Sequence, residues 1–389
     1  MSRRLRFQQG LSLIELMVAL AIGAILMLGV VQVFGASRSA YQLSEGMSRA
    51  QENARFALDF LQRDIRMAGH FGCVNDQAHV QNPPSGLHAL FAAGDPRLDF
   101  NWSIQGFEAT GTAPGKQLEI VADPDQGATS FSPALPAEFL AATSNRVGGS
   151  DILALRFLAP EGVPVTSVGG SLGEPAFAFD PDRWDVLRSG VTKPGLFGVA
   201  DCLHATVFQA SSISGGTMQA QKTGLNADLF SNGFTGGQAT LYRAVSIVYY
   251  VGRNGQGGTS LYRVRFDAPP GEPLTHERDE MVEGIDNLQL LFGQDRVIDP
   301  AQAPTGFIDR HLTADAVEAS LVEPRDAWRR VGAVQVGLLT SSPERAAAQA
   351  PQADDTLRAV GVVYEVPEDG RFRSTYQTTI ALRNRLYGN

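Results

Sequence analysis

The chain places one carboxylate, Glu15, inside an otherwise apolar run over residues 11–34. As a helix at 1.5 Å per residue, this run is long enough to cross a hydrocarbon core of about 30 Å. An ionised side chain there costs roughly 2.5–3.5 kcal/mol, so an acid inside a membrane span marks a candidate functional site that needs a partner. The residues before the run include three arginines and no acid. By the positive-inside rule, this start stays in the cytoplasm and the remainder crosses outward.

Two simpler interpretations of this segment are a secretory signal peptide and a plain membrane anchor. A signal peptide has an apolar core of about 7–15 residues that ends at a small-x-small cleavage site. The run from Leu11 to Phe34 is longer, with 24 residues. A plain anchor needs no acid at all. The length of the run and the presence of Glu15 therefore favour a retained helix in which Glu15 has a functional role.

Gly10, followed by Leu11 and four residues later by Glu15, resembles the type III signal of type IV prepilins. The resemblance implies that a prepilin peptidase in the membrane cuts after Gly10 and methylates the new amine of Leu11. Most members of that family carry Phe where this chain has Leu11. As the fifth mature residue, Glu15 is expected to neutralise the terminal amine of a neighbouring subunit, which satisfies two charges that lipid would otherwise disfavour.

Composition indicates an exported, anchored protein rather than a cytosolic enzyme, and the charge argues against nucleic-acid binding. With 389 residues, 43% of them hydrophobic, the chain can build a substantial core beyond the anchor. Its formal net charge is −9, and loss of the three leader arginines would make it −12. Nucleic-acid binding needs basic patches that replace condensed counterions, so no nucleic-acid partner is expected.

The two cysteines, Cys73 and Cys202, form an even pair in a chain expected to leave the cytoplasm. Such pairs are readily oxidised. Closing a loop of about 130 residues contributes up to about 5 kcal/mol in the chain-entropy model. The prediction is one disulfide between Cys73 and Cys202, and the alternative is two separate buried thiols.

Beyond the apolar run, the helix is predicted to continue to Ala68. Apolar residues recur there at steps of three and four, which is typical of an amphipathic helix, and Gly69 is a candidate C-cap. From Leu11 to Ala68 the helix would have 58 residues and, at 1.5 Å per residue, a length of roughly 87 Å. Its first half would lie in lipid and its second half would support a soluble domain.

From Gly72 onward, Gly and Pro become frequent and the apolar pattern changes to that of strands. Asn254-Gly255 falls between two of these runs and predicts a hairpin loop. The expected strands are Gln117–Ala122, Asp151–Leu158, Cys202–Gln209, Ala244–Val251, Ser260–Phe266, Leu288–Phe292, Ala333–Leu339 and Tyr376–Leu382.

Several phrases resemble those of the PilW-type minor pilins of type IV pilus assembly. They are DIRMAGHFGC at 64–73, DCLHATVF at 201–208, SIVYYVG at 246–252, MVEGIDNLQLLFGQD at 281–295 and TTIALRNR at 378–385. The resemblance implies a low-abundance subunit that helps to start or cap the filament. Its partners would be other minor pilins, the major pilin, the prepilin peptidase and the inner membrane. Both cysteines fall inside these phrases, which strengthens the expected pairing.

The expected fold class is α+β, with a long N-terminal helix, half transmembrane, that backs a β-rich pilin-like head. The expected divisions are a cleaved leader at 1–10, a transmembrane and pilus-core helix at 11–34, an amphipathic extension at 35–69 and a head at 70–389. The head would lie in the periplasm of a Gram-negative bacterium, first held at the inner membrane and later in a surface pilus. The alternatives are a type II secretion pseudopilin, and a tip adhesin or other ligand-binding module.

No catalytic, metal or cofactor site is expected. GGSLG at 169–173 fits the nucleophile-elbow pattern around Ser171, but no helical pattern follows, so a Gly/Ser turn is the better interpretation. Asp123 and Asp125 begin like a calcium loop whose later acidic ligands are missing. The six histidines show no metal-ligand spacing. Arg383 and Arg385 could contact a partner or simply end a solvated strand.

Overall fold

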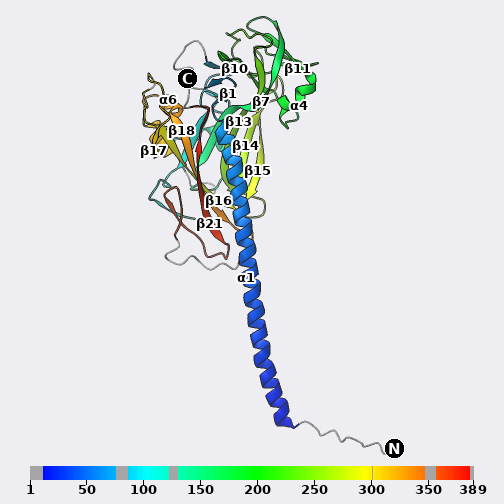
Figure 1. Ribbon diagram of the computed structural model, residues 1–389, viewed down its shortest axis with the longest axis vertical. Coiled ribbons are helices and arrows are strands. Elements are labelled where there is room, and N and C mark those ends of the chain that lie inside the picture. The colour runs from blue at the N-terminus through cyan, green and yellow to red at the C-terminus, as the bar shows by residue number, and fades with distance from the viewer. Residues whose placement is uncertain (1–11, 76–85, 122–129, 300, 347–355, 386–389) are drawn as a thin grey trace, which may run out of the picture.

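The fold is a long helix that projects from a β-rich head, which makes the chain α+β as expected (Figure 1). The computed structural model describes residues 12–75, 86–121, 130–299, 301–346 and 356–385. Helix α1 (Leu13–Met67) has 55 residues, and its first 33, up to residue 45, lie outside the head and are nearly all exposed. The second part of the helix packs against the head.

The buried side of α1 is narrow because it consists mainly of small residues. Four of its six buried residues are Gly or Ala, so the backbone approaches the strands closely, and two larger side chains near the end anchor it. Helix α1 ends at Met67, and Ala68 rather than the expected Gly69 is its C-cap. Gly69 follows with φ of 78°, a left-handed conformation that suits glycine. The six buried residues are Gly46, Ala50, Ala54, Ala57, Leu61 and Ile65.

The largest sheet is built around strand β13 (Thr240–Arg253), which has different neighbours along its length. One side of β13 pairs with β7 (Ile152–Gly170). The other side pairs first with β9 (Leu196–Ala200) and then with β14 (Thr259–Asp267). The remaining strands of this sheet are β3 (Gly86–Ala89), β4 (Ile104–Ala109), β6 (Phe131–Ser132), β8 (Pro175–Phe179), β10 (His204–Gln209), β11 (Ser212–Ser214), β12 (Thr217–Gln219) and β15 (Thr275–Glu283).

A second sheet is antiparallel and has the order β17-β16-β18-β21. Its strands are β16 (Ile285–Asp295), β17 (Ile308–Leu312), β18 (Val331–Ser341) and β21 (Arg373–Ala381). A small third sheet joins β19 (Leu357–Ala359), β20 (Val362–Glu365) and β5 (Gln117–Glu119), and a short pair joins β1 (His70–Phe71) and β2 (Val74–Asn75). The short helices are α3 (Ala137–Ala142), η1 (Pro181–Arg183), α4 (Trp184–Arg188), α5 (Ala314–Glu318) and α6 (Pro324–Arg329).

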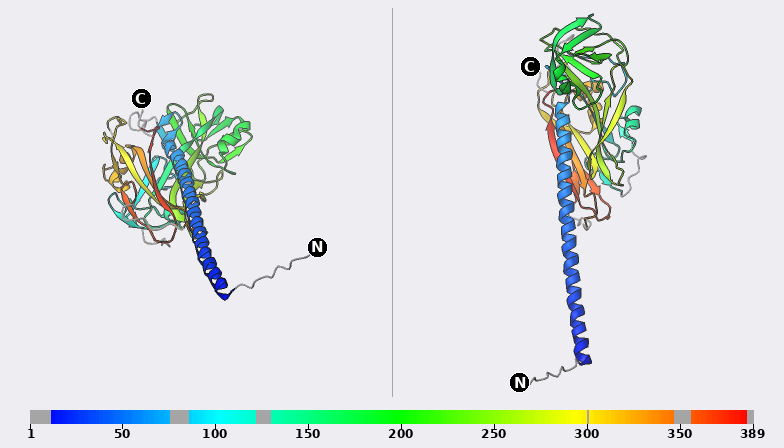
Figure 2. Two further views of the ribbon diagram at one scale, coloured as in Figure 1. Left: turned by 60° about the horizontal axis from the view of Figure 1, so that its bottom comes forward. Right: turned by 90° about the vertical axis from the view of Figure 1, so that its right-hand side faces the viewer.

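Helix α1 lies at the junction of the two larger sheets, where it contacts β7 and β15 of one and β18 and β21 of the other (Figure 2). Leu61 and Ile65 are fully buried in one core with residues of both sheets, for example Tyr249 from β13 and Leu338 from β18. Burying a side chain of this size stabilises a fold by about 1.5–3 kcal/mol. The end of α1 is therefore part of the central core of the head.

Each of the eight expected strands overlaps an observed one, and the loop of Asn254-Gly255 joins β13 to β14 as predicted. Two are shorter than expected: β5 ends at Glu119 and β10 begins at His204, while Ala122 lies outside the described residues. Strand β7 is longer than expected, because it continues past Leu158 to Gly170. Ser171 lies in the turn between β7 and β8, as the Gly/Ser-turn interpretation predicts. Arg385 does not end a solvated strand: it is 1% exposed and donates to the carbonyl oxygen of Val331. Arg383 is exposed.

Candidate assembly site

The first turn of α1 holds Glu15 through a reciprocal pair of contacts with Ser12. The backbone N–H and the hydroxyl of Ser12 each lie 3.0 Å from Oε2 of Glu15, and the N–H of Glu15 donates to Oγ of Ser12 at 3.2 Å. This arrangement is a capping box, which satisfies two backbone N–H groups that a helix start otherwise leaves free. In the single chain, the carboxylate of Glu15 therefore caps its own helix.

The capping role of Ser12 was missed in the sequence, although its signal is present. Ser12 and Glu15 have the S-x-x-E spacing in front of an apolar run that predicts a capping box. Gly10 and Leu11, the two residues of the expected processing site, lie outside the described residues. Glu15 itself is exposed at the free end of α1.

The first half of α1 presents apolar side chains on every side and has no partner in the head. Its large apolar residues between Leu13 and Phe34 are 51–76% exposed. By length and composition, this part of the helix could cross a membrane. A helix that is apolar all round is stable only in lipid or among other apolar helices. The arrangement therefore fits a membrane anchor and a helix that packs with others.

The end of α1 is fixed to the head by a buried polar contact. The hydroxyl of Tyr249 on β13 donates to Oδ2 of Asp64 at 2.6 Å, and Nη1 of Arg263 on β14 lies 3.7 Å from the same oxygen. Burial raises the pKa of Asp64, while the contacts with Tyr249 and Arg263 oppose that shift. Burial also raises the pKa of the Tyr249 hydroxyl, which therefore keeps its proton and remains a donor.

The head also packs closely against α1 where the helix leaves the head, and this close packing depends on Gly46. A Cβ atom at position 46 would lie 2.5 Å from Cβ of Ala346 and 3.3 Å from Cβ of Ser342. Ser342 is fixed in turn, because its backbone N–H donates to the carbonyl oxygen of Phe372 at 2.8 Å. Only glycine allows the segment after β18 to come so close to the helix.

Cys73 and Cys202 are joined in a disulfide, as expected from the sequence, with their Cα atoms 4.8 Å apart and a sequence separation of 129. Cys73 lies in the turn between β1 and β2, directly after α1, and Cys202 lies in the turn between β9 and β10. Strands β8 to β12 form the end of the head farthest from the N-terminus (Figure 1). The disulfide therefore ties the end of the helix to this distal part of the head.

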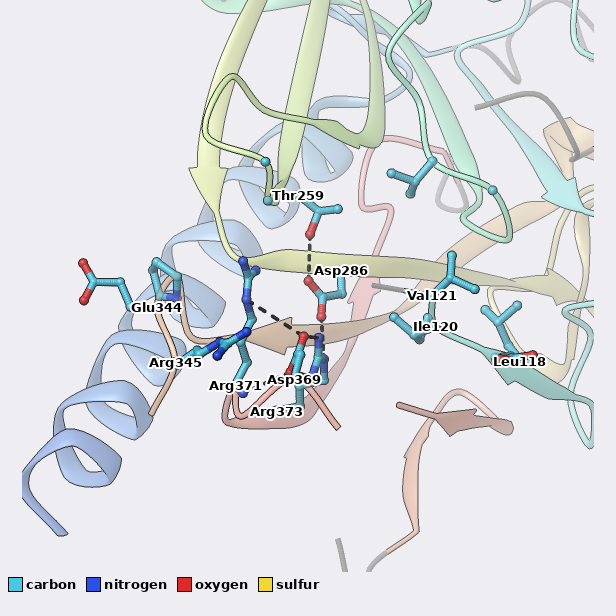
Figure 3. Close-up of a pocket in the computed structure, with 16 residues that line it drawn as sticks. Leu118, Ile120, Val121, Thr259, Asp286, Glu344, Arg345, Asp369, Arg371 and Arg373 are labelled. Atoms are coloured by element: carbon cyan, nitrogen blue, oxygen red, sulfur yellow. Dashed lines mark hydrogen bonds and ion pairs between the residues drawn. The ribbon is translucent and has the colours of Figure 1, made fainter. Parts of the chain in front are cut away.

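A pocket of about 620 Å³ lies at the other end of the head, beside the exit of α1 (Figure 3). We call it the base pocket. It is lined by residues 118–121 of β5 and the following segment, residues 147–148, the hairpin residues 257–259, Asp286 of β16, and residues 343–345, 369, 371 and 373. No pattern in the sequence indicated it, because it combines segments that are far apart along the chain.

Among the residues that the structure describes, no three His, Cys, Asp or Glu side chains form a group that could hold a metal ion. The calcium-like turn at Asp123 and Asp125 lies outside the described residues. Trp328 is buried and packs edge-on against Phe292, with ring centroids 4.7 Å apart. This tryptophan therefore belongs to the core.

Comparisons with protein families give two matches. The family of the type IV pilus-assembly protein W matches residues 248–384, and the prokaryotic N-terminal methylation motif matches residues 5–31. The first match runs from within β13 to just beyond β21, so it contains the second sheet and most of the base pocket. The second contains Ser12, Glu15 and the expected processing site. No curated protein and no solved structure matched the chain.

Proposed function

We propose that this chain, a PilW-type pilin-like protein, is a minor pilin that assembles through its N-terminal helix with other minor pilins at the start or tip of a type IV pilus. The family is one of structural proteins of pilus assembly, and we propose no catalytic role. The observation that carries the proposal is the shape of α1. From Gly46 onward the helix packs on the head, whereas residues 13–34 are apolar all round and carry one carboxylate, Glu15, near the free end.

Before assembly, the exposed half of α1 would lie in the inner membrane, with the head in the periplasm. The prepilin peptidase would cut after Gly10 and methylate Leu11, which leaves a positive amine near Glu15. The matched methylation motif supports this step. The mature chain would then consist of a helix at 11–34, an extension at 35–69 and a head at 70–389.

During assembly, the helix would leave lipid and pack against the helices of other pilins. Its apolar surface then remains buried, so the transfer costs little hydrophobic free energy. The charges would fix the register between neighbouring helices. Glu15 of one subunit would exchange its contact with Ser12 for a contact with the terminal amine of a neighbour. Coulomb attraction over a few ångströms is several-fold stronger in this low-dielectric setting than in water.

The test combines processing, partners and piliation in one strain. A strain that lacks this protein should lose most surface pili, and the intact gene should restore them. Mass spectrometry of the membrane-extracted protein should show N-methylated Leu11 as the first residue. Detergent extracts should contain the protein together with other minor pilins. Recovery only with secretion-system pseudopilins, or normal piliation without the protein, would contradict the proposal.

A further inference from the structure

In one corner of the base pocket, Arg373, Asp286 and Asp369 already have hydrogen-bond partners within the chain. Asp286 accepts hydrogen bonds from the hydroxyls of Thr259 at 2.7 Å and Ser341 at 2.8 Å, and from Nε of Arg373 at 2.9 Å. The two terminal nitrogens of Arg373 donate to Asp369 at 2.8 and 2.7 Å. The side chain of Arg373 is only 6% exposed. These contacts form a rigid wall of the pocket.

Two further arginines, Arg345 and Arg371, face this corner, and neither has a carboxylate to itself among the described residues. Nε of Arg371 lies 4.0 Å from Asp369, at the limit of an ion pair. Within the described parts of the chain, Arg345 makes no ion pair or hydrogen bond through its side chain. Figure 3 shows both arginines directed toward the corner, while the carboxylate of Glu344 points away from it. Among the described residues, three guanidinium groups of this corner thus face two carboxylates, Asp286 and Asp369.

The opposite wall of the pocket carries three apolar residues, with Glu119 among them. Leu118 and Ile120 are half-buried, and Val121 is 47% exposed although it has a large apolar side chain. All three line the pocket. Its volume is within the usual range of about 300–1,000 Å³ for ligand pockets, which combine apolar walls with a few polar groups that fix orientation. A ligand that fits both walls carries a carboxylate next to an apolar group.

The backbone beside the pocket favours an extended peptide as this ligand. Strand β5 pairs only with β20 among the described residues. On that side, the N–H of Ile120 donates to the carbonyl oxygen of Glu365, and the carbonyl oxygen of Lys116 accepts from Val363. The alternate residues, Glu119 and Val121, therefore direct their backbone groups away from β20. An unpaired strand edge of this kind accepts a further extended strand.

We propose that the base pocket binds an extended, acidic peptide segment of a partner subunit. A carboxylate of that segment pairs with Arg345 and Arg371, an apolar side chain packs on Leu118 and Ile120, and the peptide backbone runs beside β5. The inference rests on the proposed function, because a pilin head meets the segments of its neighbours when the helices pack. It adds a recognition site in the head to the contact made by Glu15.

The test uses the full chain in nanodiscs of zwitterionic lipid and a fluorescent peptide of alternating leucine and glutamate with blocked ends. A matched peptide with glutamine in place of glutamate is the neutral comparison. The acidic peptide should bind, and the neutral one should bind much more weakly. Arg345→Gln and Arg371→Gln should each weaken binding about tenfold or more, because a hydrogen bond to a charged group is lost. Arg325→Gln, at an exposed arginine of α6, should leave binding unchanged.

Equal binding of the two peptides, or unchanged binding by both pocket variants, would overturn the proposal. Binding of octanoate without any peptide binding would also overturn it, since the ligand would then be a small amphiphile. An unchanged unfolding temperature shows that Arg345→Gln and Arg371→Gln are folded. Peptide binding is measured on the isolated protein and does not require a filament. Failure here is therefore distinct from failure of the proposed function, which piliation measures.

Discussion

The hydroxyl of Tyr249 donates a 2.6 Å hydrogen bond to the carboxylate of Asp64, and this contact joins the end of α1 to the central strand of the largest sheet. The two residues are 185 positions apart. Burial would otherwise leave Asp64 with an unsatisfied oxygen, which costs about 1–3 kcal/mol. A directional hydrogen bond therefore fixes the position of the helix in addition to hydrophobic packing.

Tyr249→Phe should lower the free energy of unfolding by about 1–3 kcal/mol, because it removes the donor to Asp64 and keeps the ring in place. Chemical denaturation of the full chain in nanodiscs measures the change. Tyr376→Phe is the matched control, since Tyr376 on β21 is half-buried and forms no side-chain hydrogen bond within the described residues. Equal effects of the two substitutions would show that the contact with Asp64 does not hold the helix.

Gly46→Ala should weaken the docking of α1 although alanine is the better helix former. The added Cβ would lie 2.5 Å from Cβ of Ala346, so the segment after β18 must move. Gly35→Ala is the control, because nothing lies within 4 Å of its added Cβ. That substitution should be neutral or gain up to about 1 kcal/mol from helix propensity. Thermal unfolding should show a lower midpoint only for Gly46→Ala, and a higher one would contradict the prediction.

Replacement of Cys73 and Cys202 by serine should lower stability by about 2–5 kcal/mol, because the unfolded chain loses its closed loop. Each single replacement should have a similar effect, since either one removes the disulfide. Non-reducing peptide mapping of the exported protein should recover the two cysteines in one linked peptide pair. Recovery of both as free thiols would reject the pairing.

Glu108 should make stability depend on pH near neutrality. It is 6% exposed on β4, and burial, together with the nearby charge of Asp315, raises its pKa to about 7. The folded state then binds more protons than the unfolded state between about pH 4.5 and 7, so stability falls as pH rises through this range.

Glu108→Gln should remove this loss, because glutamine stays neutral. The variant should be more stable than the wild type at pH 8, by up to about 3 kcal/mol, and similar to it at pH 5. Glu161→Gln, at an exposed position of β7, should change neither value. Denaturation of all three proteins at both pH values tests the prediction. A parallel pH dependence of wild type and Glu108→Gln would exclude Glu108 as its source.

The long helix and the strands could be predicted because their signals are local. The expected helix, 11–68, differs from α1 by one or two residues at each end, since the apolar period and Gly69 mark its course. The length of β7 could not be predicted, because Pro160 and Pro164 disfavour a continuous strand. Pro160 lies at an irregularity in the pairing, where the register shifts between Tyr242 and Ala244 of β13. The continuity of β7 therefore depends on its pairing with β13, which the local sequence pattern does not indicate.

The functional residues likewise divide into those that the local sequence indicates and those that only the fold brings together. Glu15 and the two cysteines are visible in the sequence because a lone acid in an apolar run and an even cysteine pair are unusual in themselves. Arg345 and Arg371 are two among many surface arginines until the fold places both beside Asp369 and Arg373. Ser12 is the intermediate case, since its spacing to Glu15 is local, but its meaning depends on where the helix begins.

Three substitutions in the first turn of α1 should separate capping from assembly. Glu15→Gln retains a side chain that can complete a capping box and removes only the charge. Glu15→Ala removes both, and Ser12→Ala removes the cap partner but keeps the carboxylate, at a cost of about 0.5–2 kcal/mol to the helix start. If Glu15 pairs with the amine of a neighbouring subunit, both Glu15 variants should be inserted and processed but fail to assemble, while Ser12→Ala should still support piliation. Surface pilus counts, beside immunoblots for the processed protein, measure the outcome. If Glu15→Gln supports normal piliation and Ser12→Ala does not, the carboxylate acts as a helix cap rather than as the contact between subunits.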